Sequence, residues 1–110
     1  MRKVKRSEVA VLHLVLKKKW YDMIASGTKK EEYREAKPYW VKRIRNWMNK
    51  QPKWRHVIAF SCGYRKPDMF FPCKTFCRTY KAKVCLHPSW GEPNTDHFIL
   101  TFGQRVELED

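Results

Sequence analysis

A lysine, a glutamate and an arginine stand close together between residues 27 and 34, in the sequence Gly-Thr-Lys-Lys-Glu-Glu-Tyr-Arg. Gly27 allows a tight turn with positive φ, which would bring the backbone and Lys29 close to a ligand. Lys29 carries an ammonium that can meet a phosphate or, once desolvated, act as a base. Glu32 and Arg34 are two positions apart, so in a strand they point the same way. Glu32 can then accept from the amino group of a base while Arg34 grips a phosphate or stacks on a base.

The same three side chains also have a purely structural interpretation. In that case Glu32 and Arg34 form an ion pair that braces the scaffold, and Lys29 is exposed to solvent. The functional interpretation requires instead that all three converge in an open hollow with room for a base.

Two aromatic residues in expected loops are candidates for stacking on bases. Tyr64 and Trp90 both stand beside turn-forming residues. Stacking of a base on an aromatic side chain contributes roughly 1–3 kcal/mol. Packing at the rim of the fold is the alternative for both residues. The other tryptophans are expected in the core, three of them on apolar helical stripes: Trp20, Trp40, Trp47 and Trp54.

The cysteine and histidine patterns do not favour a metal site or a catalytic triad. The four cysteines form no CxxC pair, although Cys73 and Cys77 form CxxxC and His87 follows Cys85 by two positions. Structural zinc sites usually use two tight ligand clusters, so free thiols are expected instead. The four histidines are far apart, and none neighbours an evident nucleophile. We therefore expect no metal and no cofactor.

A strand and a short helix are predicted directly before the motif. Residues 9–16 are apolar and rich in β-branched side chains, which is typical of a buried strand. Trp20, Met23 and Ile24 repeat at helical spacing, and Gly27 supplies a glycine stop. These elements would deliver the motif at the end of a two-turn helix.

An extended segment and a second helix are predicted next. Residues 29–35 would present two very different faces as a strand. Pro38 opens an amphipathic helix that runs to about Lys50. The basic outer face of this helix suits a nucleic acid or a membrane, and its alternative is a solvated face on a helix packed against the core.

The second half of the chain is expected to consist of strands. Alternating or continuous apolar patterns cover residues 56–62, 75–85, 97–102 and 105–108, with a loop at 88–94. The short connections between the last strands exclude an all-parallel sheet. The expected fold class is α+β, with a small mixed or antiparallel sheet curled into a barrel and two flanking helices.

Basic residues are concentrated in the first half of the chain. The 110 residues include 24 Lys+Arg and 11 Asp+Glu, a formal net charge of +13. Residues 1–55 hold 17 basic and 5 acidic residues, a net charge of +12, and residues 56–110 hold a net charge of +1. Such asymmetry favours a polyanionic partner and salt-dependent binding. Solvated charge is the alternative.

Length and hydropathy bound the organisation of the protein. A chain of 110 residues favours one domain, here with a core at about residues 9–108 and a basic extension at residues 1–8. The apolar runs are far shorter than the ~20 residues of a membrane span, and no leader or lipidation motif is evident. We expect a soluble, cytoplasmic protein that contacts no membrane and has no evident obligate protein partner.

The motif and its surroundings resemble the ASCH domain family within the PUA-like superfamily. Residues 27–34 match the family pattern GxKxxExR, directly after a strand and a short helix. The similarity continues in the family's order at residues 60–64, 90–91 and 98–103, and covers about residues 9–108. The resemblance implies a single ASCH-like domain with a PUA-like β-barrel. It also implies a cleft suited to RNA, single-stranded nucleic acid or a modified nucleoside.

Two classes of function follow from the resemblance. In a binding module, Glu32 and aromatic stacking hold the base, and Lys29, Arg34 and helix lysines hold the backbone. Some family members resemble amidohydrolases on acetylated cytidine, in which the motif lysine activates water. Lys29 matches that lysine, and Glu32 stands where those members have a threonine. A ribonuclease variant would use Lys29 and Glu32 as its acid–base pair.

Overall fold

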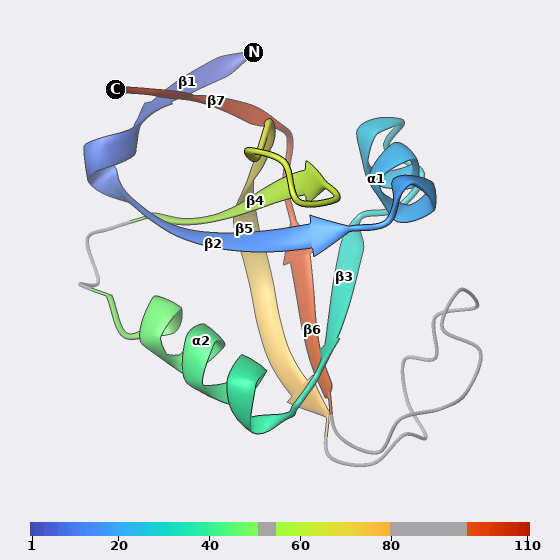
Figure 1. Ribbon diagram of the computed structural model, residues 1–110. Coiled ribbons are helices and arrows are strands. Elements are labelled where there is room, and N and C mark those ends of the chain that lie inside the picture. The colour runs from blue at the N-terminus through green and yellow to red at the C-terminus, as the bar shows by residue number, and fades with distance from the viewer. Residues whose placement is uncertain (51–54, 80–96) are drawn as a thin grey trace.

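The computed structural model describes residues 1–50, 55–79 and 97–110, which form seven strands, two α-helices and one short 3-10 helix (Figure 1). The elements, in chain order, are β1 (Arg2–Lys5), η1 (Arg6–Glu8), β2 (Val9–Leu16), α1 (Lys18–Ala25), β3 (Glu31–Glu35), α2 (Pro38–Met48), β4 (Arg55–Cys62), β5 (Met69–Thr79), β6 (His97–Phe102) and β7 (Val106–Glu109). The α+β class with two helices is confirmed.

The strands form one mixed sheet that branches at β5. Its main path has the order β1-β7-β5-β4-β2, and β6 pairs with both β5 and β3. The pairs β1–β7 and β2–β4 are parallel, and the other pairs are antiparallel. In Figure 1, β3 and β6 run across the direction of β2 and β4, so the sheet is strongly curved. Among the described residues no ladder joins β2 to β3, and closure into a barrel stays a prediction.

Both helices begin and end near their predicted positions. α1 ends at Ala25, and Gly27 follows with a φ of 83°, the left-handed conformation of a glycine stop. α2 begins at Pro38, where the missing N–H of proline costs nothing, and ends at Met48. In the described part of the chain, neither helix has the length and hydropathy needed to cross a membrane.

The main core lies between the sheet and α2. The rings of Phe60, Phe71 and Phe102 pack with centroids 4.9–5.8 Å apart. The indole N–H of Trp47 donates a 2.8 Å hydrogen bond to the carbonyl oxygen of Ala10, which ties α2 to β2. The predicted apolar stripe of α2 is confirmed, because its buried members Ile44 and Trp47 join core residues of the sheet, including Leu12, Leu14, Ile58 and Leu100.

β5 differs from the strand predicted at residues 75–85. It begins at Met69, and Met69 and Phe71 are both buried. Pro72 obscures this start in the sequence, because proline is usually excluded from a strand interior. Residues 80–85 of the predicted strand and the loop predicted at 88–94 are outside the described residues.

The basic N-terminal segment is part of the sheet. Arg2–Lys5 was expected to be an extension, but it pairs in parallel with Val106–Glu109. Val4 is buried there against Val9 and Val57. Three of the four residues of β1 point to solvent, so only one apolar side chain marks it as a strand.

Candidate functional site

The turn after α1 places two charged side chains of the motif, Lys29 and Glu32, in the interior of the fold. The backbone N–H of Lys29 donates to the carbonyl oxygen of Met23 at 3.0 Å, which closes the turn around Gly27. β3 then pairs with β6, where Glu32 lies opposite Leu100. Lys29 and Glu32 are each only 4% exposed. The motif therefore brings two charged side chains of opposite sign out of solvent.

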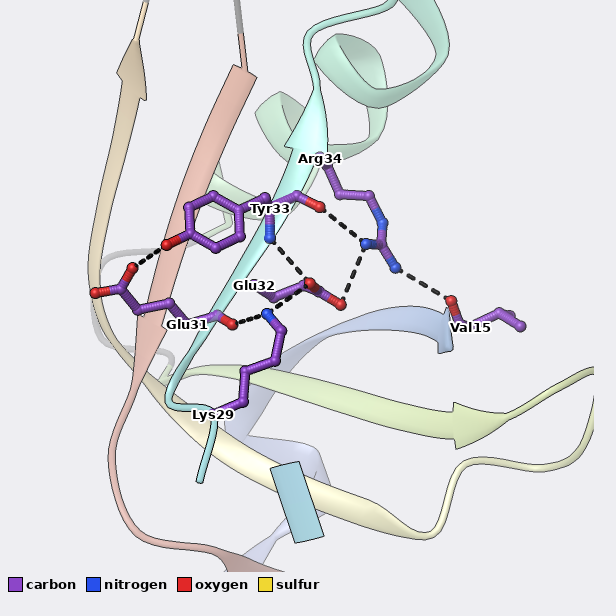
Figure 2. Close-up of polar contacts among 6 residues, drawn as sticks. All are labelled: Val15, Lys29, Glu31, Glu32, Tyr33 and Arg34. Atoms are coloured by element: carbon purple, nitrogen blue, oxygen red, sulfur yellow. Dashed lines mark hydrogen bonds and ion pairs between the residues drawn. The ribbon is translucent and has the colours of Figure 1, made fainter. Parts of the chain in front are cut away.

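The carboxylate of Glu32 receives both cations of the motif (Figure 2). Its Oε1 atom lies 3.1 Å from Nζ of Lys29 and accepts a 3.0 Å hydrogen bond from the N–H of Tyr33. Its Oε2 atom lies 3.2 Å from Nη1 of Arg34. The Lys29 ammonium also donates to the carbonyl oxygen of Glu31. Lys29 is therefore not the exposed side chain that the structural interpretation requires. We call Lys29, Glu32 and Arg34 the ionic triad.

Arg34 connects β3 to β2 through its side chain. Its Nη1 donates to the carbonyl oxygen of Tyr33 at 2.9 Å, and its Nη2 donates to the carbonyl oxygen of Val15 at 3.1 Å. The guanidinium thus spans the two strands that no ladder joins (Figure 2). This contact uses the planar fork of donors that distinguishes arginine from lysine.

One carboxylate oxygen of the ionic triad, Oε2 of Glu32, has hydrogen-bonding capacity that the described residues do not use. Desolvation of a charge costs several kcal/mol, which an ion pair offsets only with good geometry and further hydrogen bonds. Oε1 of Glu32 has two donors, whereas Oε2 accepts no hydrogen bond of good geometry from the described residues. The Arg34 guanidinium neutralises Oε2 from 3.2 Å without completing its lone-pair sites. This oxygen is closed to solvent, so a ligand N–H group would reach it only if the Arg34 guanidinium moved aside.

The ionic triad borders a pocket of about 410 Å³, which we call the motif pocket. The pocket lies where β2, β3 and both helices meet. Besides the triad, its lining residues are His13, Val15, Leu16, Lys17, Trp20, Tyr39, Trp40, Arg43 and Tyr64. Its volume falls within the roughly 300–1,000 Å³ of small-molecule sites. A pocket of suitable size therefore lies beside the ionic triad, whose Lys29 and Glu32 are each only 4% exposed.

Aromatic side chains form much of the wall of the motif pocket. Tyr64 lines it and is 100% exposed, so its ring makes no packing contribution to the fold. Trp20 and Trp40, expected in the core, pack against the core and also line the pocket. Tyr39 joins them from the first turn of α2. Trp90, the other predicted stacking residue, is outside the described residues.

Two guanidinium groups lie over the ring of Trp40. The Cζ atoms of Arg34 and Arg43 are 5.2 and 5.4 Å from the ring centroid. Arg43 also donates to the hydroxyl of Tyr39 at 2.9 Å. Within the described residues, Glu32 is the one carboxylate that lines the motif pocket, beside four cations. The pocket is therefore electropositive, and an anionic group is favoured near it.

His13 is a site residue that the sequence did not indicate. Its Nε2 lies 2.8 Å from Oγ of Ser61, and the Ser61 hydroxyl donates to the carbonyl oxygen of Gly63 at 2.9 Å. Since the serine proton is used there, Nε2 of His13 is the donor to Ser61 and Nδ1 is the acceptor. Partial burial and, to a smaller extent, the charge of Arg43 lower the pKa of His13.

The His13–Ser61 pair does not make a nucleophile. Ser61 is fully buried, and its hydroxyl proton points to Gly63 rather than to the histidine. The two residues are 48 positions apart, so no local sequence signal links them. Alternation along β2 places His13 with the outward-facing residues, which is the one feature that could have drawn attention to it.

Gly27 borders a different hollow from Glu32 and Arg34. It lines a second pocket of about 470 Å³, which we call the basic pocket. The basic pocket is lined by residues 24–27 at the end of α1, by Lys29 and Lys30, by Phe71 and Lys74 of β5, and by residues 102–105. Lys29 is common to both pockets.

Two of the described cysteines, Cys62 and Cys73, are free thiols. Burial raises the pKa of Cys73 to about 11. Within residues 1–50, 55–79 and 97–110, no three His, Cys, Asp or Glu side chains are grouped to hold a metal ion. Cys85 and His87, which together with Cys73 and Cys77 are the candidate zinc ligands in the sequence, are outside these residues.

Comparisons of the chain with known protein families, with curated proteins and with solved structures found no match.

Proposed function

We propose that the protein is an ASCH-like binding module that holds a base of RNA or another single-stranded nucleic acid in the motif pocket. The observation that carries this proposal is the buried ionic triad beside a pocket of about 410 Å³ with four aromatic lining residues. Aromatic faces suit a flat base, and Oε2 of Glu32 suits its amino group. The same site would accept a modified nucleoside.

The charges around the motif pocket support a phosphate-bearing ligand. Lys17 and Arg43 line the pocket beside the triad, and the chain has a formal net charge of +13. Cations that neutralise phosphates release counterions, which drives binding at low salt. Neither a metal nor another cofactor is needed for such binding. Because RNA is the expected ligand, we propose the cytoplasm as its place of action.

A PUA-like barrel is the finer fold that we propose for this module. The sheet is strongly curved, and the Arg34 guanidinium already links β2 and β3, which share no ladder among the described residues. In this arrangement the ionic triad would close the barrel where backbone hydrogen bonds do not. An experimental structure with β2 and β3 far apart would contradict it.

Replacement of Tyr64 tests the binding function without disturbing the fold. Because the side chain is 100% exposed, Tyr64→Ala should leave the free energy of unfolding nearly unchanged. Loss of one stacked base should weaken binding of a labelled single-stranded RNA by about 1–3 kcal/mol, roughly 5- to 150-fold. Fluorescence anisotropy at low salt measures the change.

Val11→Ala is the matched control for this experiment. Val11 is also an exposed apolar residue, at 38%, but it lines neither pocket. Its replacement should leave RNA affinity unchanged. Equal affinities of the wild type and Tyr64→Ala would contradict stacking, and failure of the wild type to bind single strands would contradict the function.

A hydrolase of modified nucleosides is the second candidate. The observation that favours it is the 3.1 Å contact between the Lys29 ammonium and Glu32, which allows a proton to pass between them. The test is release of acetate from acetylated cytidine by purified protein, or cleavage of RNA for the ribonuclease variant. Glu32→Gln keeps the shape of the side chain and should abolish turnover. Folded protein without turnover would remove this candidate.

A further inference from the structure

The basic pocket is a second hollow that the proposed function does not use. It lies at the C-terminal end of α1, between this helix, β5 and the turn after β6. Its volume is about 470 Å³, and its inner wall is apolar, with Ile24, Phe71 and Phe102. Lys30, Lys74 and Arg105 add three cations to its lining, besides the buried Lys29 that it shares with the motif pocket.

The charges of the basic pocket are poorly balanced within the protein. No carboxylate is among its described lining residues. Lys30 and Lys74 are exposed, and in the described part of the chain neither forms an ion pair. Arg105 is partly engaged, because its Nη2 donates to the carbonyl oxygen of Asp68 at 3.0 Å. An anion would therefore meet at least two uncompensated ammonium groups.

The helix end beside the basic pocket does not oppose an anion strongly. The C-terminal end of a helix carries partial negative charge on its free carbonyl groups. Here the carbonyl oxygens of Asp22, Met23 and Ile24 accept from the N–H groups of Ser26, Lys29 and Gly27. These bonds satisfy three of the last four carbonyl groups of α1, so the partial negative charge of the helix end is reduced and the lysines make the pocket positive.

The two pockets lie at the two ends of the same helix. Lys17 and Trp20, at the start of α1, line the motif pocket, whereas residues 24–27 line the basic pocket. An α-helix of eight residues is about 12 Å long, a distance that a short single strand spans. Lys29 lies between the two hollows, since it lines both.

We propose that the basic pocket is a phosphate subsite, which holds the backbone of the same strand whose base occupies the motif pocket. This inference rests on the proposed function and adds to it the path that the bound strand follows across the protein surface. The strand runs along α1, from the aromatic side chains at its first turn to Lys30 and Lys74 beyond its last turn. The apolar wall formed by Phe71 and Phe102 carries the sugar or base attached to that phosphate.

The test compares two pairs of basic residues. Lys30→Ala/Lys74→Ala removes the unpaired cations of the basic pocket, and Arg2→Ala/Lys5→Ala removes the same formal charge from β1, which lines neither pocket. The probe is a fluorescein-labelled single-stranded RNA of about twelve nucleotides, at several salt concentrations. All four replaced side chains are exposed, so both variants should fold.

The expected result is selective. Lys30→Ala/Lys74→Ala should weaken binding at least tenfold and reduce the slope of log affinity against log salt by about 1.4, the value for two phosphate contacts on a single strand. The β1 variant should change neither quantity appreciably. Equal effects of the two variants, or no effect of the first, would overturn the subsite while RNA binding by the wild type stands. No RNA binding by the wild type would overturn the proposed function, and the subsite with it.

Discussion

Glu32 is the residue to which the polar contacts of the site converge. It receives an ammonium, a guanidinium and a backbone N–H while only 4% of its surface is exposed. An unpartnered carboxylate in such surroundings would be strongly unfavourable. The carboxylate and its two cations therefore depend on one another, and each of them has a structural role besides any contact with a ligand.

This dependence predicts a large loss of stability when Lys29 is truncated. Lys29→Met removes one cation from a pair whose side chains are 3% and 5% exposed. Removal of one partner of a buried pair typically costs about 3–5 kcal/mol. Urea denaturation should show a loss of this size.

A double variant separates this loss from simple packing damage. Lys29→Met/Glu32→Gln also removes the carboxylate charge and should recover a large part of the stability. A single variant as stable as the wild type would contradict the buried ion pair. Loss of RNA binding in Lys29→Met would be ambiguous for the same reason, which is why Tyr64 is the better probe of binding.

The lowered pKa of His13 predicts a contribution to acid instability. Folding favours the neutral ring, because burial and the charge of Arg43 oppose its protonation. The unfolded chain therefore binds more protons as the pH falls below the ordinary histidine value of about 6.5, and stability is lost there. One proton accounts for a slope of at most about 1.4 kcal/mol per pH unit.

His13→Gln should reduce this loss. A glutamine at this position can still form a hydrogen bond with Ser61 but does not titrate. The free energy of unfolding should fall less between pH 7.5 and pH 5 in the variant than in the wild type, as measured by urea denaturation at each pH. A larger fall in the variant would contradict a neutral His13 in the folded protein.

At the scale of elements, the turn from α1 to β3 decides where the motif lies. Gly27 has a φ of 83°, and nothing lies within 4 Å of a Cβ built there. An alanine there would therefore cause no steric clash, and its only cost would be the left-handed backbone conformation, about 1–2 kcal/mol of stability. Gly27→Ala should lower the free energy of unfolding by this amount, as measured by thermal or urea denaturation.

Gly103→Ala is the matched control for the turn. Its φ is not in the left-handed region, and its Cβ would make an ordinary 3.5 Å contact with Cγ of Pro72. Its stability should change by only a few tenths of a kcal/mol. If both alanine variants lost equal stability, the positive φ of Gly27 would not be the cause.

The elements that were predicted correctly are those whose sequence contains a local pattern typical of a helix or a strand. The glycine stop at Gly27, the first-turn proline at Pro38 and the apolar run of β2 depend on neighbouring residues alone. β1 has no such signal, because its partner β7 is about a hundred residues away and only Val4 is buried. The start of β5 was missed because Pro72 interrupts its pattern.

The site was predictable to the same extent. Spacing alone indicated that Glu32 and Arg34 share a face, and their 3.2 Å contact agrees with it. The burial of Lys29 was not predictable, because it depends on how the turn after α1 packs. The positions of His13 and Arg43 depend on α2 crossing β2, a tertiary contact without a local pattern.

At the scale of the whole molecule, most of the positive charge is in the half of the sequence that builds the site. Residues 1–55 carry a net charge of +12 and include β2, both helices and the motif. Lys74 and Arg105 come from the other half and reach the basic pocket through β5 and the turn after β6. The fold thus brings two cations from the second half of the chain to a region whose positive charge comes mainly from residues 1–55.

This distribution predicts that RNA affinity depends on salt concentration because of the cations in the two pockets, and not because of base stacking. Among the residues that the structure describes, five cations line the pockets outside the ionic triad: Lys17, Arg43, Lys30, Lys74 and Arg105. If each meets one phosphate of a single strand, log affinity should fall with log salt with a slope of about −3.5. Tyr64→Ala should lower the affinity without changing this slope, because stacking releases no counterions. Anisotropy titrations at several salt concentrations measure both quantities, and a slope near zero would contradict the placement of phosphates at these pockets.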